Sequence, residues 1–150
     1  MANSFFIVCY KLIFKEWGKG FTILLYAAAA TTLIAGILHL TKVVDTIGSG
    51  DVISNADILF LVGGIAQVFW IIPILRQWGK TWYSIGIAGT VVFVLIWVIT
   101  RIPDNPITGK GGSISEEAII IQVFQIAFII LSLIILIKSI KVGNNKIKTN

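Results

Sequence analysis

The sequence predicts an all-α membrane protein whose four transmembrane helices form an up-down-up-down bundle in a single domain of 150 residues. Hydrophobic residues make up 57% of the chain and charged residues only 13%, about half the charged share of a typical soluble domain. A domain this small has too much surface for its volume to bury so many apolar side chains in water. The composition therefore excludes an ordinary soluble domain, a disordered chain and a disulfide scaffold.

Four apolar stretches are long enough, or nearly so, to cross a bilayer core, which takes roughly 20 helical residues. They contain no Asp, Glu, Lys or Arg, and they do not alternate in polarity as the strands of a transmembrane barrel do. The first stretch has too few apolar residues before its alanines for a cleaved signal peptide, so we interpret it as a retained helix. The predicted transmembrane helices are residues 21–41, 58–75, 83–99 and 118–137.

The N-terminal and C-terminal segments are expected to lie outside the apolar core. Within residues 1–20, one helical stripe is apolar and another carries Lys11 and Lys15, which predicts a short helix in the cytoplasmic interface. The alternative is a helix that runs straight into the first transmembrane helix, although Gly18 and Gly20 favour a break. Residues 143–150 are polar and predict a frayed tail.

The connecting segments carry signals for where the helices begin and bend. Ser54 followed by Asp57 predicts a capped helix start after an outer loop of residues 42–57, and Ser113 followed by Glu116 repeats that pattern. Pro73 predicts a kink near the end of the second helix. The short turn at residues 76–82 requires the second and third helices to be antiparallel neighbours.

The distribution of charge predicts the orientation in the membrane. Nine of the twelve Lys and Arg residues fall in the N-terminal segment, the turn and the tail, whereas six of the seven acids fall on the other side. Cytoplasmic loops of membrane proteins are enriched in Lys and Arg. We therefore predict a multi-pass plasma-membrane protein with both termini in the cytoplasm, and we attribute the net charge of +5 to topology and not to a nucleic-acid partner.

Two recurring triplets suggest a duplicated helical hairpin. Trp-Gly-Lys precedes the first and third predicted helices at residues 17–19 and 78–80, and Gln-Val-Phe lies in the second and fourth at residues 67–69 and 122–124. A duplication would relate the two halves by an axis along the membrane normal. The alternative is coincidence in an apolar chain, because tryptophan and lysine both favour the inner interface.

Polar residues near the predicted outer rim are the candidates for chemistry. His39, Asp57 and Glu117 together would form a histidine–carboxylate metal site or a proton relay. The structural alternative is that the two acids cap helix starts, while Arg101 extends its charge to the interface or pairs with them. We favour the structural alternative.

Uncharged polar and small residues within the helices predict tight packing. Gln67, Gln122 and Gln125 are assigned to hydrogen bonds between helices, with a contact to a ligand or quinone as the alternative. Gly63 and Gly86 allow neighbouring backbones to approach closely. A single histidine excludes a bis-histidine haem held by this chain, and a solitary cysteine excludes a disulfide within it.

Several segments have a familiar sequence: QVFWIIP at 67–73, RQWGKTWY at 76–83, IGIAGT at 85–90, and RIP at 101–103 followed by PITG at 106–109. Over roughly residues 58–130 the chain resembles small four-span membrane proteins of ammonia-oxidising archaea, some of which are joined to cupredoxin-like domains. This resemblance implies an accessory subunit of an archaeal ammonia monooxygenase, an oxidoreductase complex whose copper would lie in partner subunits. No site residue is carried over by it.

Three functions follow as hypotheses. The favoured one is a non-catalytic accessory or structural subunit of a multi-subunit membrane complex, whose partners are other membrane subunits and the lipid bilayer. The second is a small redox or metal-handling membrane protein that uses His39 with the rim carboxylates. The third is an oligomeric channel for a small solute, in which Gln67 and Gln125 would line a neutral pore.

Overall fold

The computed structural model of the chain describes residues 18–106, 111 and 114–148. All regular structure in this part of the chain is helical, which confirms the predicted all-α class for these residues. The predicted interfacial helix within residues 1–20 falls almost entirely outside them, as does Ser113. The helices are α2 (Lys19–Ser49), α3 (Asn55–Phe69), α4 (Ile71–Leu75), α5 (Lys80–Ile99) and α6 (Glu116–Lys148).

Four helical segments are long and apolar enough to cross a membrane. They are Lys19–Ser49, Asn55–Leu75, Lys80–Ile99 and Glu116–Ile140. Each contains one of the four stretches predicted from the sequence, so the prediction of four potential membrane-spanning helices is confirmed by length and composition.

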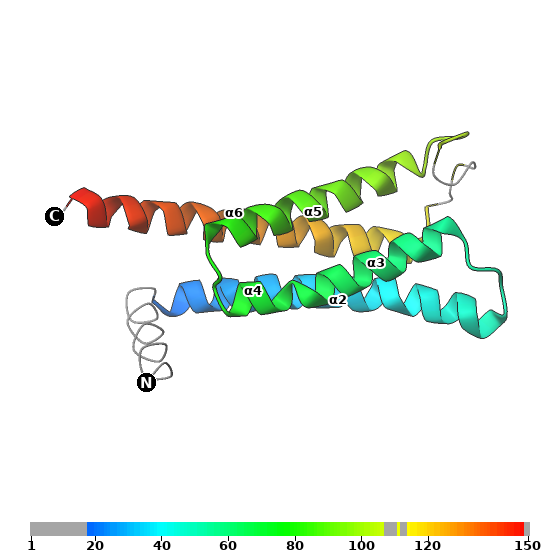
Figure 1. The fold of residues 1–150 in the computed structure, drawn as a ribbon, viewed down its shortest axis with the longest axis horizontal. Coiled ribbons are helices and arrows are strands. Elements are labelled where there is room, and N and C mark those ends of the chain that lie inside the picture. Colours follow the sequence, from blue (N-terminus) through cyan, green and yellow to red (C-terminus); the bar gives the residue numbers. More distant parts are fainter. Residues whose placement is uncertain (1–17, 107–110, 112–113, 149–150) are drawn as a thin grey trace.

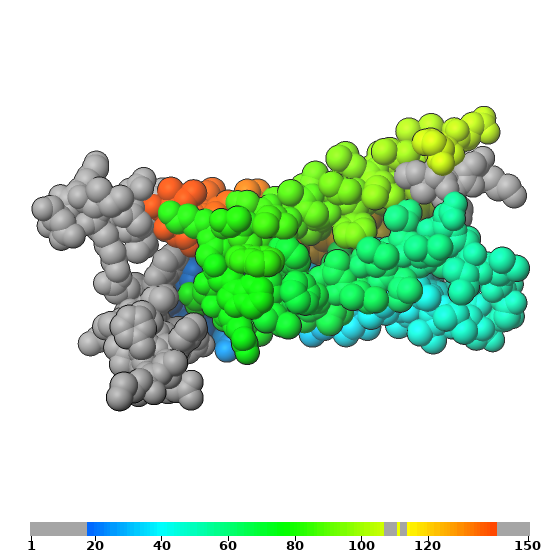
Figure 2. Space-filling model, viewed as in Figure 1, coloured from blue at the N-terminus to red at the C-terminus, as the bar shows by residue number. Residues whose placement is uncertain are grey.

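The helices lie side by side along the long axis of the molecule (Figure 1). The short loop at residues 50–54 and the segment that follows α5 lie at one end, which we call the loop end, and the turn at residues 76–79 lies at the other, the turn end. α2 packs against both α3 and α6, and α5 packs against α6. The space-filling view shows a hollow between α5 and α3 that widens toward the loop end (Figure 2).

α2 is longer than predicted, and this corrects the predicted outer loop. The helix continues through residues 42–49 and stops where Gly50 adopts a left-handed φ of 75°, a conformation that glycine adopts without steric cost. The loop to α3 therefore begins only at residue 50. The next helix begins as predicted, because Ser54 and Asp57 form a reciprocal capping box.

Near the predicted kink at Pro73, the regular helix is interrupted at the single residue Trp70, between α3 and α4, although Trp70 keeps helical backbone angles. A proline lacks the backbone N–H that would bond to the carbonyl four residues earlier, and its ring clashes with that carbonyl. For Pro73 this is the carbonyl of Phe69, the last residue of α3. The chain then turns at Gln77 and Gly79, which both have positive φ values.

α6 also exceeds its predicted length. It continues from Glu116 to Lys148, so the segment expected to be a frayed tail is helical through Lys148. A single glycine such as Gly143 weakens a helix by roughly 1 kcal/mol relative to alanine but does not by itself end it. At the other end of α6, the hydroxyl of Ser115 accepts a bond from the backbone N–H of Ala118 at 3.3 Å.

α2 and α3 approach most closely where two glycines face each other. A Cβ atom built on Gly36 would lie 3.0 Å from the carbonyl oxygen of Gly64, and one built on Gly64 would lie 3.0 Å from that of Gly36. One turn away, the hydroxyl of Thr32 donates to the carbonyl of Gln67 at 3.0 Å. These contacts hold the two helices together in the middle of the bundle.

The predicted packing glycines Gly63 and Gly86 lie against aromatic rings. A Cβ on Gly63 would approach the ring of Phe93 to 3.1 Å, and one on Gly86 would overlap the indole nitrogen of Trp70. Toward the turn end, a buried cluster that includes Phe21, Leu25 and Phe128 joins α2 to α6. The main core of the described residues therefore lies in the turn-end half.

Replacing Gly64 with alanine is expected to lower the free energy of unfolding by about 1–3 kcal/mol, the usual cost of overpacking, because the added methyl meets Leu40 and the backbone of Gly36. Gly89→Ala is the matched control, because a Cβ there meets nothing within 4 Å. Thermal unfolding in a mild detergent measures both. Equal stability of the two variants would contradict the close approach.

Candidate functional site

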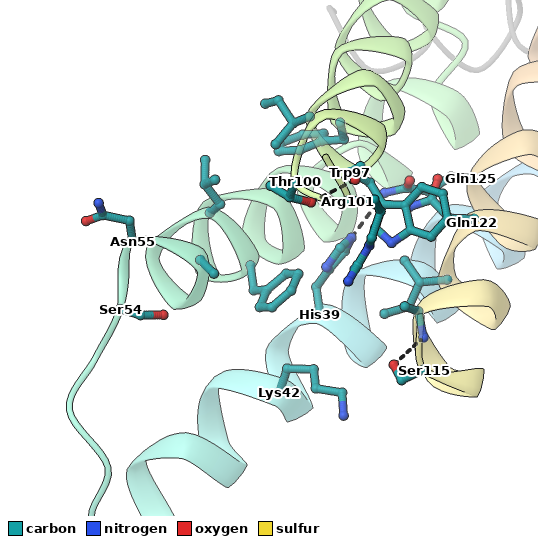
Figure 3. A pocket seen from close by; sticks show the side chains of 17 residues that line it. His39, Lys42, Ser54, Asn55, Trp97, Thr100, Arg101, Ser115, Gln122 and Gln125 are labelled. Carbon is teal, nitrogen blue, oxygen red and sulfur yellow. Dashed lines mark hydrogen bonds between the residues drawn. The ribbon is translucent and has the colours of Figure 1, made fainter. Parts of the chain in front are cut away.

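The candidate site is a cavity of about 670 Å³ in the loop-end half of the molecule, within the size range of small-molecule sites. α2 supplies His39 and Lys42, and the remaining walls come from the first turns of α3, the last turns of α5 and the first turns of α6 (Figure 3). Apolar and aromatic side chains form most of the lining. They include Leu59, Phe60, Phe93, Ile96, Trp97 and Ile121.

The cavity exists because α3 and α5 pack on different neighbours and separate from each other toward the loop end. α3 is held to α2 at Gly36 and Gly64, whereas α5 packs on α6. Where Phe93 lies against Gly63, the ring touches α3, but toward the loop end α3 and α5 diverge. The space between them leads from the cavity to the surface that the apolar helices expose.

Three neutral polar side chains form the deep part of the cavity. His39, Gln122 and Gln125 have exposed fractions of 6%, 8% and 1%. The Nε2 atoms of Gln125 and His39 are 3.1 Å apart, a hydrogen bond between α6 and α2. The His39 ring also stacks on Phe60, with ring centres 5.4 Å apart and an interplanar angle of 30°. We call His39, Gln122 and Gln125 the polar floor.

The polar floor has unused hydrogen-bonding capacity. His39 Nδ1, Gln122 Oε1 and Gln125 Oε1 are buried without a hydrogen-bond partner among the described residues. If the amide of Gln125 donates to His39 Nε2, the imidazole carries its proton on Nδ1, so the floor presents one N–H donor and two oxygen acceptors. Each such buried group costs about 1–3 kcal/mol when it is left unpaired.

A further donor lies on α5. The indole Nε1 of Trp97 is buried and has no partner among the residues that the structure describes. The guanidinium of Arg101 lies 5.1 Å from the centre of the Trp97 ring, a cation–π arrangement at the loop end of the cavity. The cavity therefore combines apolar walls with convergent polar groups from α2, α5 and α6.

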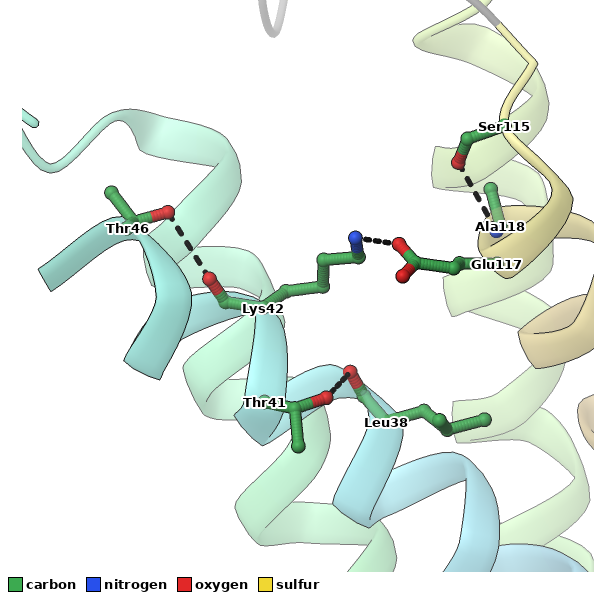
Figure 4. Close-up of polar contacts among 7 residues, drawn as sticks. All are labelled: Leu38, Thr41, Lys42, Thr46, Ser115, Glu117 and Ala118. Carbon is green, nitrogen blue, oxygen red and sulfur yellow. Dashed lines mark hydrogen bonds and ion pairs between the residues drawn. The ribbon is translucent and has the colours of Figure 1, made fainter. Parts of the chain in front are cut away.

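Three charged residues at the loop end, Lys42, Asp57 and Glu117, have polar partners within the molecule. Lys42 on α2 forms an ion pair with Glu117 on α6 (Figure 4). Asp57 accepts bonds from Ser54 at its own helix start and from the hydroxyl of Thr46 on α2 at 3.0 Å. These contacts explain why α2 continues past residue 41, since its added turns bond to both neighbouring helices.

The structure does not bring the candidate metal ligands together. His39 contacts Gln125, Asp57 contacts Ser54 and Thr46, and Glu117 contacts Lys42. Among the described residues there is no group of three or more His, Cys, Asp or Glu side chains placed to hold a metal ion. Of the glutamines assigned to helix packing, Gln122 and Gln125 line the cavity, whereas Gln67 does not.

Sequence reasoning missed the aromatic walls. Phe60, Phe93 and Trp97 line the cavity, but aromatic residues in an apolar stretch do not stand out from core residues. The one available signal was the spacing of Trp97 and Arg101, which places a donor and a cation on the same helical face.

A double-mutant cycle separates a shared metal site from independent contacts. His39→Ala and Gln125→Ala should couple by about 0.6 kcal/mol, the average for hydrogen bonds between membrane helices. His39→Ala and Glu117→Gln should be additive within about 0.5 kcal/mol, because the two residues share no partner. Unfolding in detergent measures both cycles. Strong coupling of His39 with Glu117, together with stoichiometric metal in the purified protein, would contradict this geometry.

Comparisons of the chain with known protein families, with curated proteins and with solved structures gave no match.

Proposed function

We propose that the chain is a multi-pass protein of the plasma membrane, that its helices cross in an up-down-up-down order, and that both termini are cytoplasmic. Four helices of sufficient length and apolar character support the membrane location. The concentration of Lys and Arg in the N-terminal segment, the turn and the tail supports the orientation. In this orientation, the loop end and its cavity lie in the outer half of the membrane.

Cysteine labelling tests the orientation. In a Cys9→Ser background, Ser49→Cys at the loop end should react with an impermeant maleimide on intact cells. Thr81→Cys at the turn end, exposed in the structure, should react only after permeabilisation. Thr81 is preferable to Gly79, whose φ of 110° would strain a cysteine. The reverse labelling pattern would overturn the proposed orientation.

We further propose that the protein binds a small lipid-soluble molecule in this cavity, without catalysing a reaction itself. The observation that carries the proposal is the polar floor, where three side chains more than nine-tenths buried hold unpaired atoms within an apolar cavity. An occupant that hydrogen-bonds to these atoms would remove their desolvation cost.

The position of the cavity supports entry from the bilayer. The hollow between α3 and α5 faces the side of the bundle (Figure 2), and both helices are rich in exposed large apolar residues, such as Ile58, Val62 and Leu95. A ligand with an apolar tail could leave that tail in the hydrocarbon while its polar head reaches His39 and the glutamines. Ligand sites of this form, mostly apolar with a few oriented polar groups, are typical of small-molecule binding proteins.

Photolabelling tests the binding function. A diazirine-bearing long-chain alcohol should label the last turns of α5 and the first turns of α6, and excess unlabelled alcohol should compete. Ala118→Phe, which fills the cavity, should lower labelling about tenfold, whereas Ala88→Phe on the exposed face of α5 should not. Peptide mass spectrometry locates the label. Labelling spread evenly over the lipid-facing helices, without competition, would rule out a specific site.

A second candidate function is an accessory subunit of a larger membrane complex. α5 supports it, because it is the most exposed of the four helices and carries Ala88 and Gly89 on its outer surface. Such small residues let a partner helix approach closely. The sequence resemblance makes an archaeal ammonia monooxygenase, with copper in its partner subunits, the proposed complex. Purification from native membranes as a lone monomer in a mild detergent would rule this candidate out.

A further inference from the structure

We propose that the cavity binds the headgroup of a lipid-soluble quinone, in both its oxidised and reduced forms. This inference rests on the proposed binding function and names the class of ligand. It is carried by the donors and acceptors of the polar floor, by the absence of unpaired charge there, and by the aromatic walls.

The hydrogen-bonding groups match both redox forms of a quinone. An oxidised quinone has two carbonyl oxygens on opposite sides of its ring, and these can accept from His39 Nδ1–H and Trp97 Nε1–H. A quinol has two hydroxyl groups, which can donate to Gln122 Oε1 and Gln125 Oε1. Because these atoms come from α2, α5 and α6, a head with polar atoms on two sides satisfies more of them than a single hydroxyl does.

The charge of the site favours a neutral head over an anionic lipid. His39, Gln122 and Gln125 contribute no carboxylate or ammonium to the deep part of the cavity. The charge of Lys42, at the loop end, is already balanced by Glu117. The second cation of the lining, Arg101, lies over the ring of Trp97 on α5. The polar floor itself therefore offers an anionic head only neutral amide and imidazole groups, and desolvating an anion is costly in a low-dielectric site.

The walls suit a flat ring. Phe60, Phe93 and Trp97 line the cavity, and the His39 ring already stacks on Phe60 and lies 6.5 Å from the centre of Phe93. Aromatic rings stack favourably with an offset or at an angle, at separations of about 4.5–7 Å. A quinone ring on the floor would extend this arrangement, and its isoprenoid tail would leave between α3 and α5.

Calorimetric titration of the purified chain in nanodiscs tests the proposal. The probes are decylubiquinone, its reduced quinol, and decanol, which carries a comparable tail with one hydroxyl. Nanodiscs made with and without phosphatidylglycerol provide the anionic-lipid arm. Both redox forms should bind about tenfold more tightly than decanol, and phosphatidylglycerol should not compete. A tenfold change corresponds to about 1.4 kcal/mol, close to one hydrogen bond.

Single substitutions test which side chain bonds to each redox form of the quinone. Gln122→Leu should weaken quinol binding about tenfold and quinone binding less, whereas His39→Phe should weaken quinone binding more than quinol binding. Gln67→Leu is the matched control, because Gln67 is also buried with an unpaired Oε1 but does not line the cavity. Thermal unfolding checks that each variant is folded. Because Gln122 Oε1 has no hydrogen-bond partner among the described residues, Gln122→Leu removes the proposed acceptor without breaking a bond to that oxygen, and it is the primary variant.

The outcomes separate the two proposals. Decanol binding that Ala118→Phe abolishes, with no preference for either quinone form, would overturn the quinone inference and leave the binding function standing. Binding only of phosphatidylglycerol, or equal losses in Gln67→Leu and Gln122→Leu, would also overturn the quinone inference. Failure of every probe to bind would overturn the binding function as well.

Discussion

The close approach of α2 and α3 at Gly36 and Gly64 is the constraint on which the rest of the structure depends. It fixes α3 to α2 in the middle of the bundle, where two backbones meet without side chains between them. α5 is positioned separately, by its packing on α6. α2 and α6 also pack on each other and are joined toward the loop end by the His39–Gln125 bond and the Lys42–Glu117 ion pair, so the helices that separate at the loop end are α3 and α5. Larger side chains at the crossing would force α3 away from α2, and both of these helices contribute walls to the cavity.

The hydrogen bonding of buried polar side chains differs between the tightly packed part of the bundle and the cavity. Where the helices pack tightly, Thr32 bonds to the carbonyl of Gln67 and Tyr83 to that of Ile74 on the neighbouring helices, although Gln67 Oε1 and Ser132 Oγ are buried without a partner among the described residues. In the loop-end half, where α3 and α5 separate, the bond between His39 and Gln125 is formed but His39 Nδ1 and Gln125 Oε1 have no partner among the described residues. A membrane offers no water to satisfy such atoms in its core. The cavity is therefore where several buried polar atoms, on His39, Gln122 and Gln125, could bond to an additional polar group.

The sequence predicted what depends on neighbouring residues. Four long apolar stretches, the capping box at Ser54 and the break upstream of Pro73 are local signals, and each is present. The predicted ends of α2 and α6 were wrong, because both helices are longer than expected. For α2, the lysine and the aspartate that follow residue 41 resemble the start of a loop. The added turns of α2 remain helical because Lys42 and Thr46 contact Glu117 and Asp57, which are distant in the sequence.

The candidate site was predictable only in part, for the same reason. His39, Asp57 and Glu117 are all near the loop end, as expected, but the sequence does not show that each has a different partner. The pairing of His39 with Gln125 joins residues 86 positions apart and requires knowing which faces of α2 and α6 meet. Phe60 and Trp97 became recognisable as walls only once the divergence of α3 from α5 was known.

In the proposed membrane orientation, the unequal lengths of the helices would make the bundle sensitive to bilayer thickness. α2 has 31 residues and α5 has 20, so at about 1.5 Å per residue they are roughly 46 Å and 30 Å long. A hydrocarbon core of about 30 Å matches α5, whereas α2 must tilt or project beyond it. Thicker membranes would bring more hydrocarbon over the opening between α3 and α5, and thinner ones would bring headgroups to it. Hydrophobic mismatch would then control access to the interior without any change in the side chains that line it.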